Sequence, residues 1–305
     1  MPTITSATLL RKEYSRLIDA LLVMGDRAQA QACAELAVQN GVWRHPQQRP
    51  TDFHESLPQL PLYDTADLWF VRYLEDQFPI IRDEVLRVVE PSAEGFSPVE
   101  EPLVGRGRWE EMIFYEGGIR MERSCALFPE TAAIVSRISE AVMSTGVIML
   151  SWLHPNTHIV PHCGATNSRL RVHLGIRVPD GASMRVGDKH IVWREGRCLV
   201  FDDSFEHEVW NKSSQPRVVL LFDIVHPMLP LSALGTTGEA SDVLEEKAKA
   251  FLQSRGISAI DRDCASDELT IFPDRETRLT ILRYMKDHGA TSVELAEGRL
   301  HIERN

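Results

Sequence analysis

The sequence has little of what nucleic-acid-binding or disulfide-stabilised proteins need. Lysine and arginine together number 33 against 44 aspartate and glutamate residues, so the net charge is −11. No basic cluster with interleaved aromatic residues is present, and nucleic acid is therefore not an expected partner. The five cysteines are odd in number and widely spaced, which favours reduced thiols over a disulfide framework or a zinc site.

Long apolar runs are also missing. No stretch approaches the ~20 apolar residues that a bilayer span requires. Residues 1–20 are polar and charged, unlike a signal peptide. We therefore expect a cytoplasmic protein without membrane contact. The composition, 43% hydrophobic and 25% charged, is ordinary for a globular chain, and 305 residues predict one main domain with additions.

The two ends of the chain predict small additions to that domain. Apolar residues at helical spacing over 6–24 and 26–40 predict a helical hairpin, which we place in an N-terminal region of residues 1–45. The hairpin is similar to one tetratricopeptide unit, but no second copy follows at a period of about 34 residues. Residues 229–305 predict a small α+β module, with helices over 240–254 and 275–288 and a hairpin of strands Ser292 to Ala296 and Arg299 to Glu303.

The middle region, residues 46–228, changes from helical to strand patterning. Helices are predicted over 66–89 and 129–144, with a strand over 109–115 between them. Eight short apolar runs separated by turn residues then predict strands at 147–153, 158–162, 170–178, 183–186, 190–193, 198–201, 207–210 and 218–225. This pattern predicts a mainly β jelly roll, or double-stranded β-helix, with flanking helices.

Histidines are concentrated in the strand-rich segment, which holds seven of the eleven. The ends of barrel strands meet at the mouth, so His162 and His207 could lie together around a metal ion. Non-haem Fe(II) oxygenases normally use two histidines and one carboxylate, commonly as His-x-Asp/Glu with a distant histidine. Here the first element is His162-Cys163-Gly164, with glycine in place of the carboxylate. Spacing alone therefore does not establish an iron site.

Three longer stretches resemble the aspartyl/asparaginyl β-hydroxylase family in composition, order and spacing. They read HPNTHIVPHCGATN from residue 154, RLRVHLG from residue 169 and FDDSFEHEVW from residue 201. Weaker similarity extends over roughly residues 40–228. The resemblance implies a double-stranded β-helix that holds Fe(II) by two histidines, His162 and His207, with water where a carboxylate would otherwise bind.

The resemblance also implies a set of groups for 2-oxoglutarate. Ser151 and Arg217 match the family's contacts to its distal carboxylate, and Arg171 and His173 match the contacts at its other end. Arginine suits a dicarboxylate because its planar fork matches a carboxylate. Arg169, Arg171 and His173 alternate along one predicted strand and are expected to face the same side. We expect Arg169 to hold a substrate carboxylate beside the iron.

The implied function is that of an Fe(II)- and 2-oxoglutarate-dependent dioxygenase. Such an enzyme uses dioxygen, decarboxylates 2-oxoglutarate to succinate and hydroxylates an amino acid, here at the β-carbon of Asp, Asn or a related residue. Members that act on protein domains carry a lysine two residues before the serine, where this chain has Met149. A small amino acid, free or carrier-bound, or a peptide is therefore the expected substrate.

Two alternatives remain open. The glycine at position 164 leaves an iron position that chloride could take, as in a non-haem halogenase or another oxidative tailoring enzyme for a carrier-bound amino acid. From a different class, the chain could be a non-catalytic β-barrel that binds a ligand or a partner. The presence of both the histidine and the arginine sets argues against this second alternative.

Overall fold

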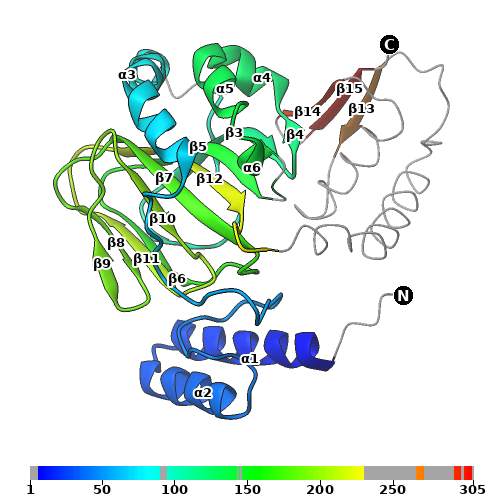
Figure 1. The fold of residues 1–305 in the computed structure, drawn as a ribbon, viewed down its shortest axis with the longest axis vertical. Coiled ribbons are helices and arrows are strands. Elements are labelled where there is room, and N and C mark those ends of the chain that lie inside the picture. The colour runs from blue at the N-terminus through cyan, green and yellow to red at the C-terminus, as the bar shows by residue number, and fades with distance from the viewer. Residues whose placement is uncertain are drawn as a thin grey trace.

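The computed structural model describes residues 6–89, 95–142, 144 and 146–229, together with three short strands further along the chain. Two antiparallel sheets form a barrel with helices α3 to α5 on one side, and a helical hairpin lies on another (Figure 1). This is the predicted jelly roll with flanking helices. The helices of the predicted C-terminal module fall outside the described residues.

The N-terminal hairpin consists of α1 (Ser6–Val23) and α2 (Arg27–Gln39), close to the predicted bounds. Asp26, the last residue of the turn between α1 and α2, accepts a hydrogen bond from the Gln29 backbone N–H and so caps the N-terminus of α2. Small buried residues on α2, such as Ala34, let the helices approach closely. The hairpin packs with Val42 and Trp43 into a core of its own.

The large sheet has the strand order β1-β3-β5-β12-β7-β10, with β4 paired to β3. Its strands are β1 (Ser97–Pro98), β3 (Trp109–Glu116), β4 (Ile119–Arg120), β5 (Val147–Leu153), β7 (Arg169–Arg177), β10 (Cys198–Phe201) and β12 (Arg217–Val225). The small sheet has the order β2-β6-β11-β8-β9. Its strands are β2 (Val104–Arg106), β6 (Thr157–His162), β8 (Ala182–Val186), β9 (Lys189–Ile191) and β11 (His207–Asn211).

Strands of the large sheet are buried on both faces, as the continuous apolar run of β12 requires. On one face, Val218, Leu220 and Phe222 of β12 pack against the helices. On the other, Val219 and Leu221 belong to the barrel core, which also contains residues of the small sheet. The same alternation places Arg217 and Asp223 on the barrel side, because side chains two residues apart share a face.

Helix α3 (Trp69–Val89) covers the outer face of the large sheet, with Pro79 inside it. Three shorter helices, α4 (Glu122–Leu127), α5 (Pro129–Val135) and α6 (Ser139–Val142), complete the layer. The single helix predicted over 129–144 was wrong. The chain leaves the helix after Val135, and Ile138 is fully buried between α5 and α6.

Three strands lie beyond the barrel: β13 (Ser266–Thr270), β14 (Ser292–Ala296) and β15 (Arg299–Glu303). They form an antiparallel sheet in the order β13-β15-β14. The predicted terminal hairpin is confirmed, since both of its strands have the expected bounds. β13 was not predicted from the sequence.

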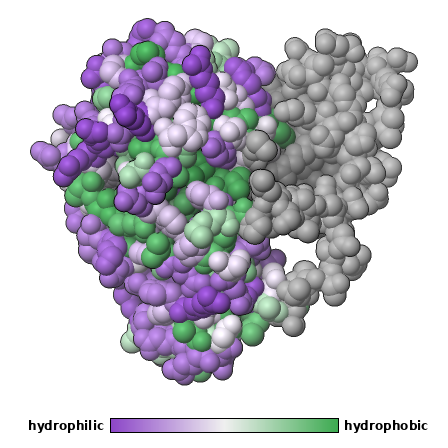
Figure 2. Space-filling view, in the orientation of Figure 1, coloured by the Kyte–Doolittle hydropathy of each residue, from purple (hydrophilic) through white to green (hydrophobic). Residues whose placement is uncertain are grey.

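Figure 2 shows an apolar band across the middle of the visible face, bordered by hydrophilic side chains above and below. Large apolar side chains exposed elsewhere on the described surface include Val23 and Met24 at the turn after α1. None of the helices in the described part of the chain combines the length and apolar character needed to cross a bilayer.

Candidate active site

His162 and His207 lie side by side at the ends of neighbouring strands of the small sheet. They are register partners in the β6–β11 pair, and their ring centroids are 4.0 Å apart. Strict alternation from Ile159, which is in the barrel core, would turn His162 outward. A bulge between Ile159 and His162 on β6 changes the alternation and brings His162 onto the same side as His207.

Both imidazoles are prepared to bind a metal through Nε2. Nδ1 of His162 lies 2.9 Å from the Val160 carbonyl oxygen, and Nδ1 of His207 lies 2.9 Å from that of Phe205. A carbonyl oxygen can only accept, so Nδ1 carries the proton in each ring and Nε2 keeps its lone pair. Burial lowers the pKa of His162 to about 4 and that of His207 well below its usual value, so both rings are neutral at pH 7.

Gly164 follows at the position where a carboxylate ligand would be expected. Its N–H donates to the Asp203 carbonyl at 2.7 Å, and a Cβ at this position would come within 2.5–2.7 Å of the Asp203 carboxylate. No side chain fits there. Within the described ranges, no group of three His, Cys, Asp or Glu side chains is placed to hold a metal ion. The geometry therefore matches a site with two protein ligands.

Arg217 is a buried cation that has no carboxylate partner among the described residues. It is 2% exposed, stacks at 4.9 Å over the Trp193 ring, and donates only a long 3.5 Å hydrogen bond to the Ser151 hydroxyl. Its Nε has no partner, and burial lowers the pKa of the guanidinium to about 9. It remains charged at pH 7, so an anion is needed to complete the site.

His173 presents a second unpaired donor to the same interior. Trp193 donates its indole N–H to His173 Nδ1 at 3.1 Å, so the proton of the neutral ring must be on Nε2. Nε2 is buried and has no hydrogen-bond partner in the described structure. Burial, with Arg217 and Arg171 nearby, holds the pKa of His173 well below its usual value. A carboxylate oxygen would satisfy this N–H.

Arg171 differs from these two because carboxylates of the chain already engage it. Its Nε and Nη2 donate to Asp223 at 2.8 and 3.1 Å, and Nη2 lies 3.0 Å from Asp203. Burial alone would raise the pKa of Asp223, but Arg171 and Arg169 bring it below its usual value. The expected role of Arg171 at 2-oxoglutarate can therefore use only the remaining Nη1 side.

Arg169 lies near the cluster of Arg171, Asp203 and Asp223 and has a side-chain donor without a partner among the described residues. Its Nε is buried without a hydrogen-bond partner, and no ion pair joins it to another described residue. It lies close enough to both carboxylates to act on them electrostatically: burial raises the pKa of Asp203 against the effect of Arg171 and Arg169, whereas at Asp223 the two arginines outweigh burial and the pKa is lowered. The structure thus brings all seven predicted site residues onto the barrel side, with three of them offering unpaired donors: Arg169, His173 and Arg217.

Sequence reasoning missed three residues that position this set. Asp223 clamps Arg171, Trp193 supports both Arg217 and His173, and Trp109 donates its indole N–H to Ser151 Oγ at 2.9 Å. Alternation along β12 from Arg217 could have placed Asp223 on the inner face. Trp193 and Trp109 are joined to the site only by the fold, so no sequence signal pointed to them.

We expect Asp223→Asn to destabilise the chain by about 1.5 to 3 kcal/mol, because Arg171 would lose a charged hydrogen-bond partner while its ion pair with Asp203 remains. Urea denaturation would measure the change. Asp83→Asn is the control, because Asp83 pairs with Arg82 on an exposed part of α3. Its expected cost is below about 1 kcal/mol. Equal costs for the two variants would show that the Arg171 clamp adds no special stability.

Comparison with known proteins shows which family the chain belongs to. The family model described as aspartyl/asparaginyl beta-hydroxylase matches residues 75–227. The chain is 35% identical over 221 residues to aspartyl/asparaginyl beta-hydroxylase from Mus musculus, covering 71% of this chain and 30% of the relative. It is 33% identical over 176 residues to ornithine lipid ester-linked acyl 2-hydroxylase from Rhizobium tropici, covering 55% of this chain and 61% of the relative.

Solved structures show more distant likeness. A prolyl-4-hydroxylase from Pseudomonas putida is 12% identical with a TM-score of 0.34, covering 51% of this chain and 99% of that one. These values are too low to carry an argument about function. The chain spans only about 30% of the length of the mouse relative. By the family model and the identity to that relative, the chain belongs to the aspartyl/asparaginyl β-hydroxylase family.

Proposed function

We propose that the chain is an Fe(II)- and 2-oxoglutarate-dependent dioxygenase that hydroxylates a small amino-acid substrate at its β-carbon. The observation that carries the proposal is the set of buried donors without partners, Arg217 and His173, beside two imidazoles that both present Nε2. Unpaired buried donors indicate a missing anion, since each costs desolvation free energy. A barrel that only bound an anion would not also need two neutral imidazoles that present Nε2 beside them.

His162 and His207 would hold the iron through Nε2. Iron with 2-oxoglutarate and dioxygen supplies the oxidative decarboxylation to succinate that drives hydroxylation. The backbone carbonyls of Val160 and Phe205 fix the tautomer and orientation of the two rings. The protein's own contribution is to place these ligands before iron binds.

Arg217 would pair with the distal carboxylate of 2-oxoglutarate, with Ser151 as the second donor. Ser151 Oγ accepts from Trp109, so its own proton is free to point at a carboxylate oxygen. His173 would donate from Nε2 to the other end, next to the free side of Arg171. A carboxylate in this desolvated interior would gain charge-assisted hydrogen bonds that are stronger than neutral ones.

Arg169 would hold the carboxylate of the substrate. Arg171 is paired with Asp203 and Asp223, whereas Arg169 and Arg217 have no ion-pair partner among the described residues, which leaves an excess of unpaired cations before any ligand binds. That excess suits a site that must hold a dicarboxylate and an anionic substrate together. A neutral substrate would leave Arg169 without a counter-charge.

The residue type at position 149, methionine, favours a small substrate. It replaces the lysine of members that act on protein domains, and here it is 5% exposed in the barrel core with Leu153 and Leu221. An uncharged side chain at this position gives no ionic contact to a protein partner. The Rhizobium relative is named for acyl 2-hydroxylation of a lipid, so lipid-borne substrates also belong in the test.

We expect succinate release coupled to a product 16 mass units heavier than the substrate, the mass of one added oxygen atom. The screen should cover free amino acids, carrier-bound amino acids, short peptides and an ornithine lipid, each with and without chloride. Mass spectrometry of both products measures the coupling. The expected result is turnover of a free or carrier-bound amino acid or a peptide.

Each other result would change the proposal in a defined way. A chlorinated product would make the enzyme a halogenase, and turnover of only the ornithine lipid would replace the amino-acid substrate by an acyl chain. Turnover of only a folded protein domain would contradict the small-substrate proposal. Absence of any 2-oxoglutarate consumption would favour a binding barrel.

A further inference from the structure

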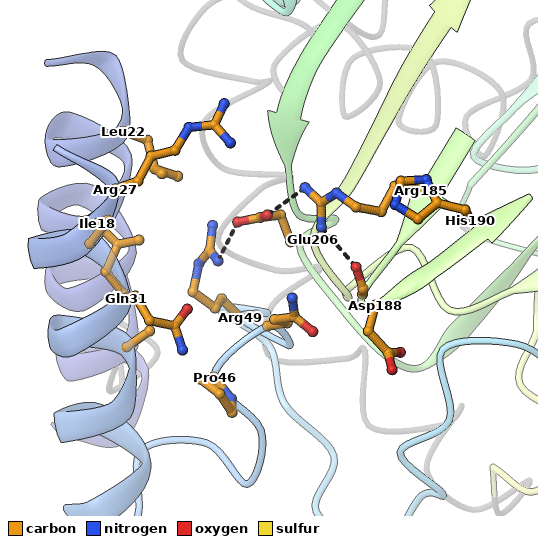
Figure 3. Close-up of a pocket in the computed structure, with 14 residues that line it drawn as sticks. Ile18, Leu22, Arg27, Gln31, Pro46, Arg49, Arg185, Asp188, His190 and Glu206 are labelled. Atoms are coloured by element: carbon orange, nitrogen blue, oxygen red, sulfur yellow. Dashed lines mark hydrogen bonds and ion pairs between the residues drawn. The ribbon is translucent and has the colours of Figure 1, made fainter. Parts of the chain in front are cut away.

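A cavity of about 350 Å³ lies between the helical hairpin and the outer face of the small sheet (Figure 3). Arg185 of β8 faces it, whereas the neighbouring Met184 and Val186 belong to the barrel core. The cavity is therefore on the opposite side of this sheet from His207. Its volume is sufficient for a small organic ligand.

Arg49 lines this cavity and has donors that the protein does not satisfy. It is 4% exposed, and its Nη1 donates to Glu206 Oε2 at 3.0 Å. Its Nε and Nη2 have no hydrogen-bond partner among the described residues. Nη2 also forms an ion pair with Asp19 at 3.5 Å, so Nε is the donor that neither carboxylate reaches. Leaving such groups unsatisfied is costly, so a buried arginine of this kind points to a missing acceptor.

The other cations of the lining differ in how far they are paired. Arg185 is saturated, because Nη2 contacts Glu206 at 2.7 Å and Glu208 at 3.2 Å while Nη1 donates to the Gly187 carbonyl. Arg27, at the start of α2, has no ion pair with a described residue, and Figure 3 shows its side chain extending toward the barrel side of the cavity. Arg27 is thus without an ion pair among the described residues, whereas Arg49 is ion-paired with Asp19 and Glu206 but keeps its Nε without a hydrogen-bond partner.

The opposite wall is apolar. Ile18 of α1 and Ala30 and Ala34 of α2 line it, each at most 2% exposed, together with Pro46. A ligand that satisfied both walls would need an anionic end for the arginines and a short aliphatic part for the helices. A bare inorganic anion would leave the apolar wall without contact.

We propose that this cavity binds a small organic anion, whose single carboxylate or phosphate group meets Arg49 and Arg27 and whose short aliphatic body lies against α1 and α2. The site is separate from the barrel interior and does not depend on the proposed iron chemistry. Arg49 supplies a fork that matches either a carboxylate or a phosphate.

The test is calorimetric titration of the full chain with hexanoate, hexyl phosphate and inorganic phosphate, each with and without saturating 2-oxoglutarate. We expect at least one of the two hexyl compounds to bind at one per chain, unaffected by 2-oxoglutarate, and more tightly than inorganic phosphate. Arg27→Gln and Arg49→Gln should each weaken this binding by about tenfold or more, the loss expected for a hydrogen bond to a charged group.

Two further variants guard against a folding artefact. Gln31→Trp adds bulk at an exposed position of α2 that lines the cavity, and should block binding without removing a buried charge. Arg16→Gln is the control, because Arg16 is exposed and its ion pair in the described part of the chain is with Glu13. The proposal is overturned if neither hexyl compound binds, if 2-oxoglutarate displaces them, if Gln31→Trp binds normally, or if inorganic phosphate binds equally well.

Discussion

Replacing His162 by alanine is expected to abolish hydroxylation while leaving the chain folded. With only two protein ligands, the loss of one leaves a single imidazole, which cannot hold iron in place. In the described structure the side chain's hydrogen bond is to the Val160 carbonyl on its own strand, so truncation removes no hydrogen bond between elements and loses only the ring contact with His207. Succinate release, bound metal and the midpoint of thermal unfolding would be measured together.

His158→Ala is the matched control for this experiment. His158 lies on the same strand but on the outer face, where it stacks on Trp210 and pairs with Glu208. We expect this variant to keep its iron and its activity. Retained activity in His162→Ala would remove the iron site as proposed here, whereas equal losses in both variants would point to damage to the strand.

Arg217→Ala is expected to weaken 2-oxoglutarate binding by ~2 to 5 kcal/mol, the range for breaking a buried charged pair. Arg217→Lys should recover only part of that loss, because a point charge replaces a planar fork. Titration with 2-oxoglutarate under anaerobic conditions measures both. Arg197→Ala, which removes an exposed arginine paired with Glu75, should bind normally. An unchanged affinity in Arg217→Ala would show that another group anchors the distal carboxylate.

The free protein offers a second readout for Arg217. Burying its charge without a carboxylate partner costs free energy, which only the bound anion repays. Arg217→Met keeps most of the volume and removes the charge, so without 2-oxoglutarate it should be at least as stable as the parent chain, by up to a few kcal/mol. A structural role for Arg217 would instead make this variant less stable.

Much of the barrel could be predicted because its strands have sharp local signals. The bounds of β5 and β10 agree with the prediction at both ends, since each is an apolar run that begins or ends near turn residues. The prediction of one helix over 129–144 failed because Ile138, between two short helices, is buried in the core. Helical spacing does not reveal where tertiary packing interrupts a helix.

The candidate site was predictable in its membership but not in its details. Motif resemblance named His162 and His207, and the structure brings them together through a bulge that simple alternation would not include. The engagement of Arg171 by Asp203 and Asp223 depends on the pairing of β7 with β12, which no single segment specifies. The unpaired state of Arg217 and His173 likewise becomes visible only when all their neighbours are placed.

The packing of Gly164 against Asp203 also constrains how this site can evolve. A single substitution at position 164 cannot introduce a third protein ligand, because the Asp203 carboxylate fills the space that any new side chain would enter. Removing Asp203 first would leave Arg171 with Asp223 as its one close carboxylate in the described structure. Conversion to a three-ligand centre therefore requires at least two changes, the first of which weakens an existing ion-pair cluster. In the proposed iron site, steric exclusion at position 164 thus favours two protein ligands over three.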